Sequence, residues 1–362
     1  MSQPSYRAAI IGVGRIGNSY DDEVVARQPA TYYQGANRHT GLYVVLPVNH
    51  AEAYQTTPGF TLVAAANRGR DKLAAFGERR GITALYTDVQ QLLRQEQPDV
   101  VSVCTQSPEK AEITIAAAEA GVKAIVVEKA LATSMAEADA MLRACEQNGV
   151  LLVVNHPNRF SPLVRRTKEL IEAGALGELT SVTVHAGGGM LHIGTHLFDL
   201  MRYWAGDAVE LYAQVPHYAP EQDLPAVGLV HFANGVTALF DHTHRDQQWL
   251  EVRGQQGYLT ISSMVGDGWL HQFEPTQPPT VKRQYPHRLT SQPLTSPPHT
   301  VSPTQRLLAE LYTTLTTGAP FLSTGRDGAA ALELGLACYV SHRAGRPVAL
   351  PLADRSFRVP NR

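Results

Sequence analysis

Hydrophobic and polar positions form alternating blocks through the first 155 residues. Short, almost uninterrupted apolar runs recur, and mixed stretches with apolar residues three or four positions apart lie between them. The runs predict buried strands and the mixed stretches predict amphipathic helices, a pattern typical of a parallel sheet covered on both faces. The predicted strands are 8–11, 61–66, 84–86, 100–104, 124–127 and 150–154, and the predicted helices are 71–80, 88–95, 112–120 and 134–148.

The pattern changes after Asn155. A predicted helix ends at Gly174, and several segments of strand composition follow, two of them joined by the hairpin dipeptide Asn234-Gly235. Successive strands favour a large, mostly antiparallel open sheet with helices against one face. The predicted strands are 180–185, 226–232, 236–241, 249–253 and 258–261; the helices are 162–173, 195–204, 304–317 and 327–344; and 272–303 is predicted to be a long excursion rich in Pro, Thr and Gln.

The first strand leads directly into Gly12-Val13-Gly14-Arg15-Ile16-Gly17, a G-x-G-x-x-G pattern. Gly12 permits a tight turn, Gly14 lets the backbone approach a pyrophosphate, and Gly17 allows the helix to pack closely on the strand. The free N–H groups of the helix N-terminus then bind the anion. The second strand begins unusually late, so we interpret 18–49 as an insertion that forms either a binding loop or a solvated loop.

Length and composition narrow the class of protein. A chain of 362 residues favours two domains, which we place at 1–155 (Rossmann dinucleotide-binding) and 156–362 (α+β, substrate-binding). A net charge of −2 gives no reason to expect binding to nucleic acid or membranes. No apolar run approaches the length of a membrane helix, no signal peptide is recognisable, and the three cysteines are widely spaced. We therefore expect a cytoplasmic protein with free thiols.

Asn67-Arg68-Gly69-Arg70 follows the second strand, where NAD-binding sites usually offer a carboxylate to the ribose. Asn67 removes that carboxylate, and Arg68 is placed to pair with a 2′-phosphate, which favours NADP over NAD. The alternative is that the arginines are solvated and Asn67 contacts the ribose of NAD.

Lys129 directly follows the fifth strand. Ligands of open α/β sheets bind beyond the carboxyl ends of the strands, so Lys129 is expected beside the nicotinamide. An ammonium there can bind a substrate hydroxyl and stabilise the alkoxide that forms as hydride leaves. The alternative is a surface ion pair between Glu128 and Lys129.

His192 and His196 follow the glycine run 187–189, four positions apart. If the helix extends back to His192, both imidazoles lie on one face and one of them can remove a hydroxyl proton. The same spacing suits zinc, with His242 and His244 as further ligands. No Glu follows the first His as in H-E-x-x-H, so we expect acid–base chemistry and no metal.

Together these features resemble the glucose–fructose oxidoreductase / inositol dehydrogenase / rhizopine catabolism (Gfo/Idh/MocA) family. The resemblance covers nearly the whole chain: the glycine turn, Glu128-Lys129, 155–160, His196-x-x-Asp199 and Gly345-Arg346-Pro347-Val348. It implies a Rossmann domain followed by an open sheet that often mediates oligomer contact, with Lys129 and His196 as catalytic residues. Ala130 stands where the family has Pro, His192 where it often has Asp, Thr105-Gln106 where it has Thr-Pro, and Lys110 where His is common.

The resemblance implies an NAD(P)-dependent oxidoreductase that transfers a hydride to or from a carbinol carbon of a sugar, glycoside or cyclitol. Two alternatives remain open: a redox-neutral NAD-dependent glycosidase, and a cofactor-sensing regulator without catalysis. We expect a homodimer or homotetramer. The expected catalytic residues are Lys129, His196 and His192; the cofactor-binding residues are Gly12, Gly14, Arg15, Ile16, Gly17, Asn67, Arg68, Thr105, Glu128 and Lys129; and the substrate-binding residues are Lys129, Asn155, Arg159, His192 and Asp199.

Overall fold

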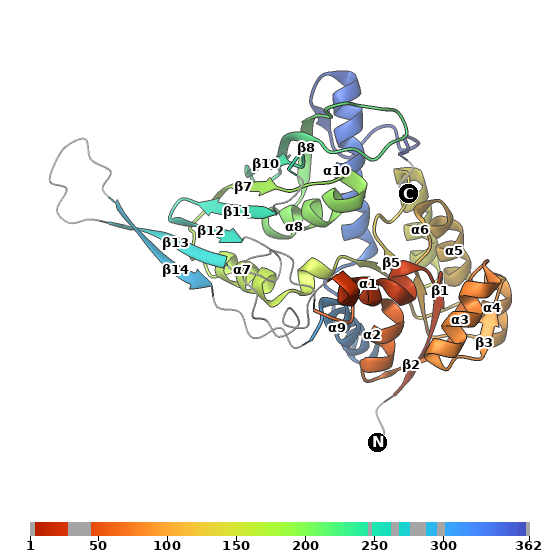
Figure 1. The fold of residues 1–362 in the computed structure, drawn as a ribbon. Coiled ribbons are helices and arrows are strands. Elements are labelled where there is room, and N and C mark those ends of the chain that lie inside the picture. Colours follow the sequence, from red (N-terminus) through yellow and green to blue (C-terminus); the bar gives the residue numbers. More distant parts are fainter. Residues whose placement is uncertain are drawn as a thin grey trace, which may run out of the picture.

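The computed structural model describes residues 4–27, 45–244, 248–261, 268–275, 287–294 and 301–359. Within them the chain forms two β-sheets that lie side by side (Figure 1). The first sheet has six strands in the order β3-β2-β1-β4-β5-β6, all parallel, which is the Rossmann order. Its strands are β1 (Tyr6–Ile11), β2 (Phe60–Ala66), β3 (Ala84–Tyr86), β4 (Val100–Val103), β5 (Ala124–Glu128) and β6 (Leu151–Asn155). The predicted parallel sheet is confirmed.

Helices flank this sheet close to their predicted positions. The largest difference is α5, which begins at Ser107 rather than at 112, because Pro108 occupies the first turn, where its missing N–H costs no hydrogen bond. Asn49 caps α2 by accepting a hydrogen bond from the backbone N–H of Glu52. The helices are α1 (Tyr20–Arg27), α2 (His50–Thr56), α3 (Arg70–Arg80), α4 (Val89–Glu96), α5 (Ser107–Glu119) and α6 (Met135–Gln147).

Both ends of the predicted insertion, 18–49, are fixed to the first sheet's helices. The carboxylate of Asp21 in α1 accepts hydrogen bonds from the backbone N–H groups of Val48 and Asn49, each 3.0 Å long, which holds α1 against the start of α2. Arg80 is buried and donates to the side chain of Asn18. Tyr32, Tyr33 and His39 lie outside the described residues.

The second sheet has nine described strands in the order β14-β13-β12-β11-β7-β10-β9-β8-β15. Only β7 and β10 pair in parallel within this described part, so the predicted mostly antiparallel sheet is confirmed. Its strands are β7 (Leu179–His185), β8 (Ala208–Gln214), β9 (Val227–Phe232), β10 (Thr237–Asp241), β11 (Trp249–Gly254), β12 (Gly257–Ile261), β13 (Gly268–Pro275), β14 (His287–Leu294) and β15 (Val348–Ala349).

Four strands of this sheet were not predicted. β8 and the short β15 pair with each other at one end of the sheet. β13 and β14 form a projecting hairpin, drawn in blue at the left of Figure 1, so the prediction of an excursion over 272–303 is wrong for the described residues. Pro293 obscured the strand pattern, yet β14 is the edge strand, where a residue without an N–H is tolerated.

Helices pack on one face of the second sheet. Val182 and Val184 of β7 alternate with more exposed residues and belong to the same core as residues of α8 (Thr195–Ala205) and α10 (Gly325–Ala344). α7 (Pro162–Glu172) and a short 3-10 segment (Pro157–Phe160) connect the two sheets. α9 (Pro303–Thr317) returns to the first sheet, where Leu307, Leu308 and Leu311 share a core with Tyr6 and Tyr54.

Among the described residues, no helix has both the length and the apolar character that crossing a membrane requires.

Candidate active site

The three glycines of the turn after β1 differ in the space that a side chain would have. Gly12 has φ +95°, and a Cβ there would lie 2.9 Å from the Thr105 backbone nitrogen. A Cβ on Gly17 would lie 2.2 Å from the carbonyl oxygen of Gly12. A Cβ on Gly14 would meet no atom within 4 Å, so this position faces open space. The protein itself therefore requires glycine at Gly12 and Gly17, whereas Gly14 leaves room for a ligand, as the motif predicts for a pyrophosphate.

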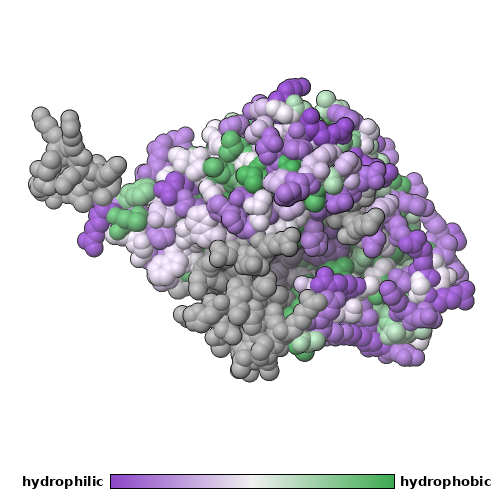
Figure 2. Space-filling model, turned by 45° about the horizontal axis from the view of Figure 1, so that its top comes forward, coloured by the Kyte–Doolittle hydropathy of each residue, from purple (hydrophilic) through white to green (hydrophobic). Residues whose placement is uncertain are grey.

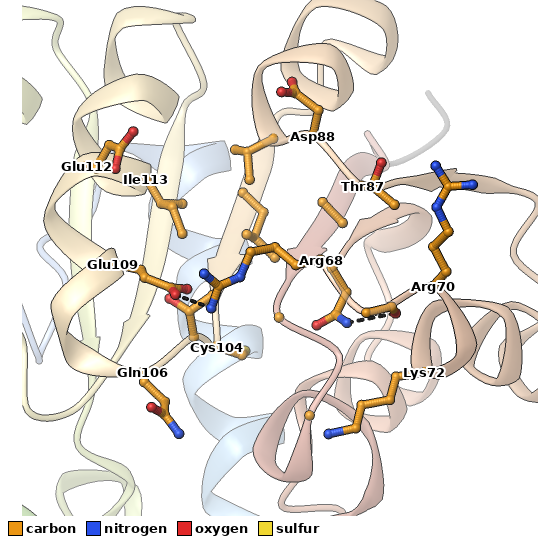
Figure 3. A pocket seen from close by; sticks show the side chains of 18 of the residues that line it. Arg68, Arg70, Lys72, Thr87, Asp88, Cys104, Gln106, Glu109, Glu112 and Ile113 are labelled. Atoms are coloured by element: carbon orange, nitrogen blue, oxygen red, sulfur yellow. Dashed lines mark hydrogen bonds and ion pairs between the residues drawn. The ribbon is translucent and has the colours of Figure 1, made fainter. Parts of the chain in front are cut away.

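A cavity of about 850 Å³ opens beside this turn (Figure 3). The side-chain amide of Asn67 links its walls: Oδ1 accepts a hydrogen bond from the Val13 N–H (3.4 Å) and Nδ2 donates to the Gly69 carbonyl (3.0 Å). Thr105 also lines the cavity, and its buried Oγ1 has no hydrogen-bond partner among the described residues. An open glycine and an unpaired hydroxyl at the carboxyl ends of parallel strands fit a dinucleotide.

Charged side chains stand on two walls of this cavity. Arg68, Arg70 and Lys72 come from the β2–α3 side, and Arg68 reaches across to form an ion pair with Glu109 of α5 (Figure 3). The Arg68 side chain is 83% exposed, so this ion pair is screened by water. Arg68 is therefore available to a phosphate but already has an acidic partner.

Arg15 and Ile16 form the start of the helical turn after Gly14. The Arg15 guanidinium forms an ion pair with Glu23 (2.8 Å) and lies 4.2 Å from the centre of the Tyr20 ring.

Lys129 follows β5, two strands from β1 in the sheet. Its Nζ donates a hydrogen bond to the backbone carbonyl of His192 (2.7 Å) and lies 3.4 Å from Nδ1 of the same residue. Burial lowers the pKa of Lys129, although the Glu128 and Asp223 carboxylates oppose this effect. The structure thus brings together Lys129 and His192, which are 63 residues apart in the chain.

His192 and His196 lie one helical turn apart. A π-helical segment (Met190–Gly194) continues directly into α8, which confirms that the helix extends back to His192. The positive charge of Lys129, followed by burial, lowers the pKa of His192. Burial, the Lys129 charge and the neighbouring His156 lower the pKa of His196 well below its usual value. Both imidazoles are therefore neutral near pH 7 and able to accept a proton.

Beneath Lys129, the Glu128 carboxylate is buried in a hydrogen-bonded network. Its Oε1 lies 2.9 Å from Nε2 of His50 and accepts a hydrogen bond from Nδ2 of Asn155 (2.6 Å). The other ring nitrogen of His50 is 2.9 Å from Oγ of Ser102. Burial opposes both charges, but Cys104 and the Glu128 carboxylate raise the pKa of His50 to about 10, and His50 lowers the pKa of Glu128 to about 2. Glu128 is thus half of a buried ion pair rather than of a surface pair with Lys129.

Lys110 fixes the backbone around Lys129. Its buried Nζ donates to the carbonyls of Glu128 (2.6 Å), Lys129 (3.2 Å) and Ala130 (2.7 Å). Burial lowers the pKa of Lys110 to about 7. The Lys129–Ala130 peptide is cis. Lys110, which stands where the family that the sequence resembles commonly has histidine, is identified by these contacts as a positioning residue.

Behind His196 lies a second buried network. Nε of Arg159 donates to Oδ2 of Asp199 (2.7 Å), and Oδ1 of Asp199 lies 3.1 Å from Nδ1 of His156. The His156 and His196 rings meet edge to face with their centres 5.7 Å apart. His156 and Arg159 lower the pKa of Asp199 to about 2 against the effect of burial. Arg159 also binds the Leu322 carbonyl and Asp327, so its polar contacts, like those of Asp199, are with the protein.

Asp223, which follows β8, was not predicted. Its carboxylate accepts hydrogen bonds from the backbone N–H groups of Leu191 and His192 (both 2.8 Å) and from the Tyr339 hydroxyl (2.8 Å). It therefore fixes the turn that carries His192. An aspartate in a loop has no periodic pattern around it, so the sequence offers no sign of this role.

The structure separates the histidines considered as zinc ligands. His242 is buried against Phe198 and Phe240, whereas His244 is exposed and lies near His185. Neither His192 nor His196 belongs to the cluster of three possible metal ligands found in the described part of the chain.

Comparisons with known proteins agree with this geometry. Residues 6–156 match the GFO_IDH_MocA model, described as an oxidoreductase family with an NAD-binding Rossmann fold, and 168–350 match the model of its C-terminal alpha/beta domain. The chain is 29% identical over 330 residues to D-apiose dehydrogenase of Paraburkholderia graminis, covering 83% of this chain and 86% of the relative. It is 27% identical to myo-inositol 2-dehydrogenase of Thermotoga maritima, with coverages of 58% and 70%.

Among solved structures, an oxidoreductase from Agrobacterium radiobacter in complex with NAD+, L-tartaric acid and magnesium shares the fold. The TM-score is 0.72 at 20% identity, with 95% of this chain and 98% of that chain covered. The two sheets, the glycine turn and the matches to both family models agree, and the chain therefore belongs to the GFO_IDH_MocA family of oxidoreductases.

Proposed function

We propose that this oxidoreductase is an NAD(P)-dependent dehydrogenase that acts on a carbinol carbon of a sugar, glycoside or cyclitol. The observation that carries the proposal is the meeting of the Lys129 ammonium with the helix that bears His192 and His196, beyond the carboxyl end of β5. The names of the relatives, which include D-apiose dehydrogenase, myo-inositol 2-dehydrogenase and D-glucoside 3-dehydrogenase, support the substrate class.

Each of the three groups has a chemical role in this proposal. When bound, the nicotinamide supplies the hydride acceptor or donor. The Lys129 ammonium, which has three N–H donors, binds the reacting oxygen and stabilises its negative charge. His196 takes the hydroxyl proton as a neutral imidazole, and His192 orients the substrate or assists this proton transfer.

We propose that the glycine turn and the cavity beside it hold the cofactor. The contacts would come from Gly12, Gly14, Arg15, Ile16, Gly17, Asn67, Arg68, Thr105 and Lys129, with Glu128 acting from below through its ion pair with His50. NADP is favoured over NAD because Arg68, Arg70 and Lys72 place three cations on one wall and no carboxylate occupies position 67. Glu109 weakens this preference by pairing with Arg68.

The proposed substrate contacts divide into direct and indirect ones. Lys129, His192 and His196 are the groups we place against the substrate. Arg159 and Asp199 act as positioning residues through their buried ion pair behind His196, and Asn155 acts through Glu128. Substrate contact by Asn155, Arg159 and Asp199 remains a prediction.

We further propose a cytoplasmic homo-oligomer formed through the second sheet. The face of this sheet opposite α8 and α10 bears exposed Leu239 and Trp269. Leu289 is 47% exposed on the projecting hairpin, where Figure 2 shows hydrophobic surface. Apolar side chains on an uncovered face favour association with a second copy.

The decisive experiment is a panel of polyols, aldoses, cyclitols and aryl glycosides offered with NAD and with NADP. We expect substrate-dependent formation of NADH or NADPH, measured by absorbance. Release of aglycone with no net change in nicotinamide absorbance would instead identify a redox-neutral glycosidase. Cofactor binding without turnover of any compound would identify a sensor and contradict the proposal.

A further inference from the structure

We propose that His185, Asp241 and His244 form a binding site for a divalent transition-metal ion such as Zn²⁺. The three residues lie where β7 and β10 end, and their ligand atoms are all within 4.8 Å of one another. None of them takes part in the hydrogen bonds described for Lys129, His192 or His196. The site thus goes beyond the proposed dehydrogenase function and does not depend on it.

The backbone of the second sheet places the three side chains. His185 and Asp241 are direct neighbours in the parallel pairing of β7 with β10, so their side chains project from the same face. After Asp241 the chain stays beside β7, because the N–H of His244 donates to the Ala186 carbonyl (3.0 Å) and the N–H of Ala186 donates to the Asp241 carbonyl (2.9 Å). His244 is thereby held above the same pair of strand ends.

Hydrogen bonds and ring contacts with neighbouring residues orient the metal-binding atoms of these side chains. Oδ1 of Asp241 accepts hydrogen bonds from the backbone N–H (2.9 Å) and hydroxyl (2.6 Å) of Thr243, which leaves Oδ2 directed toward Nε2 of His244 at 3.1 Å. The His185 ring has its centre 5.6 Å from that of His244 and 5.6 Å from that of Trp249. Hydrogen-bonded carboxylates and packed imidazoles are the usual surroundings of metal ligands.

The donor set selects the class of ion. Two imidazoles and one carboxylate suit Zn²⁺, Co²⁺, Ni²⁺ or Fe²⁺, whereas Mg²⁺ and Ca²⁺ require more oxygen ligands. Metal–ligand bonds of about 2.0–2.2 Å place two tetrahedral ligands about 3.3–3.6 Å apart, and Oδ2 of Asp241 already lies 3.1 Å from Nε2 of His244. Any wider donor pair within the 4.8 Å limit must close to this spacing. His244 is exposed and can make this adjustment by rotating its ring.

A bound ion would join two segments of the second sheet, the end of β7 and the end of β10 with the residues that follow it. The chain continues from His185 through the glycine run to His192, so the site is seven residues ahead of a proposed catalytic residue in the sequence. Without metal, Asp241 and His244 form an ordinary, partly exposed surface contact that contributes little to stability.

The test is a calorimetric titration of the untagged, EDTA-treated full chain with Zn²⁺ in the absence of nucleotide. We expect one tight equivalent for the wild type. His244→Gln removes a direct ligand and should weaken binding by at least about 100-fold, since loss of a group that only contacts a ligand already costs about 10- to 100-fold, and the double variant His185→Ala/His244→Ala should abolish it. His231→Gln is the matched control, since His231 is an exposed histidine on the neighbouring β9. Circular dichroism of each variant checks folding, and His244→Gln keeps the test valid if the double variant does not fold.

A second readout uses Co²⁺, whose visible absorption reports its ligands. We expect a spectrum in the wild type and in His231→Gln that is lost in the double variant. Either of two results would overturn the proposal: wild-type protein that binds no stoichiometric Zn²⁺, or variants that bind it as tightly as the wild type. Because no nucleotide or substrate is present, both results are independent of the dehydrogenase assay.

Discussion

The carboxyl edge of the first sheet carries two sites of different construction. Around Lys129, charged groups are buried and each has several partners: Glu128 with His50 and Asn155, and Asp199 with Arg159 and His156. In the cavity beside the glycine turn, Arg68 is exposed to solvent and forms an ion pair with Glu109 on the opposite wall.

The difference predicts how each site responds to substitution. Removing one member of a buried ion pair leaves an uncompensated charge and is strongly destabilising, whereas exposed pairs contribute little. Substitutions in the buried networks around Lys129 should therefore cause large losses of stability or activity. Substitutions in the cavity should change the preference for NADP or NAD by small amounts.

Lys129→Met should have the largest effect on turnover. Loss of the ammonium removes the group that stabilises the reacting oxygen, so kcat should fall about 10²- to 10³-fold, as for the loss of an oxyanion donor. Steady-state kinetics on the best substrate measures kcat, and fluorescence titration should show that binding of the reduced cofactor, which has many other proposed contacts, changes far less than kcat. Lys123→Met is the control, because Lys123 forms an exposed pair with Asp99. Unaffected turnover in Lys129→Met would remove Lys129 from the mechanism.

His50→Leu should have a large effect on stability. It leaves the Glu128 carboxylate buried with Asn155 as its remaining side-chain partner, and we expect the free energy of unfolding to fall by about 3–5 kcal/mol. Denaturant unfolding measures the change. Glu109→Gln, which breaks the exposed pair with Arg68, is the comparison and should change stability by less than about 1 kcal/mol. Equal losses in the two variants would show that burial does not distinguish the two sites.

The pH profile of kcat/KM should have an acid limb and an alkaline limb that lie below the ordinary pKa values of histidine and lysine, respectively. The pKa values of His192 and His196 are lowered from 6.5, so the neutral base persists below that pH and the acid limb for alcohol oxidation should lie below 6.5. The pKa of Lys129 is lowered from 10.5, so activity that needs the ammonium should be lost on an alkaline limb below 10.5.

Lys129→Arg distinguishes this alkaline limb from general unfolding. A guanidinium stays protonated, so residual activity of this variant should persist to higher pH. An acid limb at or above pH 6.5 in the wild type would argue against a buried, neutral histidine as the base.

Arg68→Ala and Glu109→Gln should have the smallest effects and opposite signs. The first removes a partner of the 2′-phosphate and should weaken NADPH binding about tenfold, with less than about a threefold effect on NADH, since the site is exposed. The second frees Arg68 and should strengthen NADPH binding by about threefold. Titration with both reduced cofactors, and with 2′,5′-ADP against ADP, measures the ratio. Identical changes for phosphorylated and unphosphorylated ligands would exclude Arg68 as the discriminating group.

Local sequence was sufficient to predict the first sheet and the outline of its site. Most strands there are short apolar runs that can be recognised from a few consecutive residues. Gly12 is required locally by its φ of +95°, and Gly17 by its contact with the Gly12 carbonyl oxygen five residues earlier. The position of Lys129 at a strand's carboxyl end and the one-turn spacing of His192 and His196 were also available from local sequence, because both depend only on nearby residues.

Which side chains face one another depends on contacts between distant parts of the chain. Glu128 and His50 are 78 residues apart, Asp223 binds the backbone 31 residues before it, and Pro293 lies in a strand because β13 supplies its neighbour. His185 meets Asp241 only through strand pairing. Propensity and periodicity describe interactions along a segment, whereas ion pairs, edge strands and ligand clusters depend on partners that the chain brings together only when it folds.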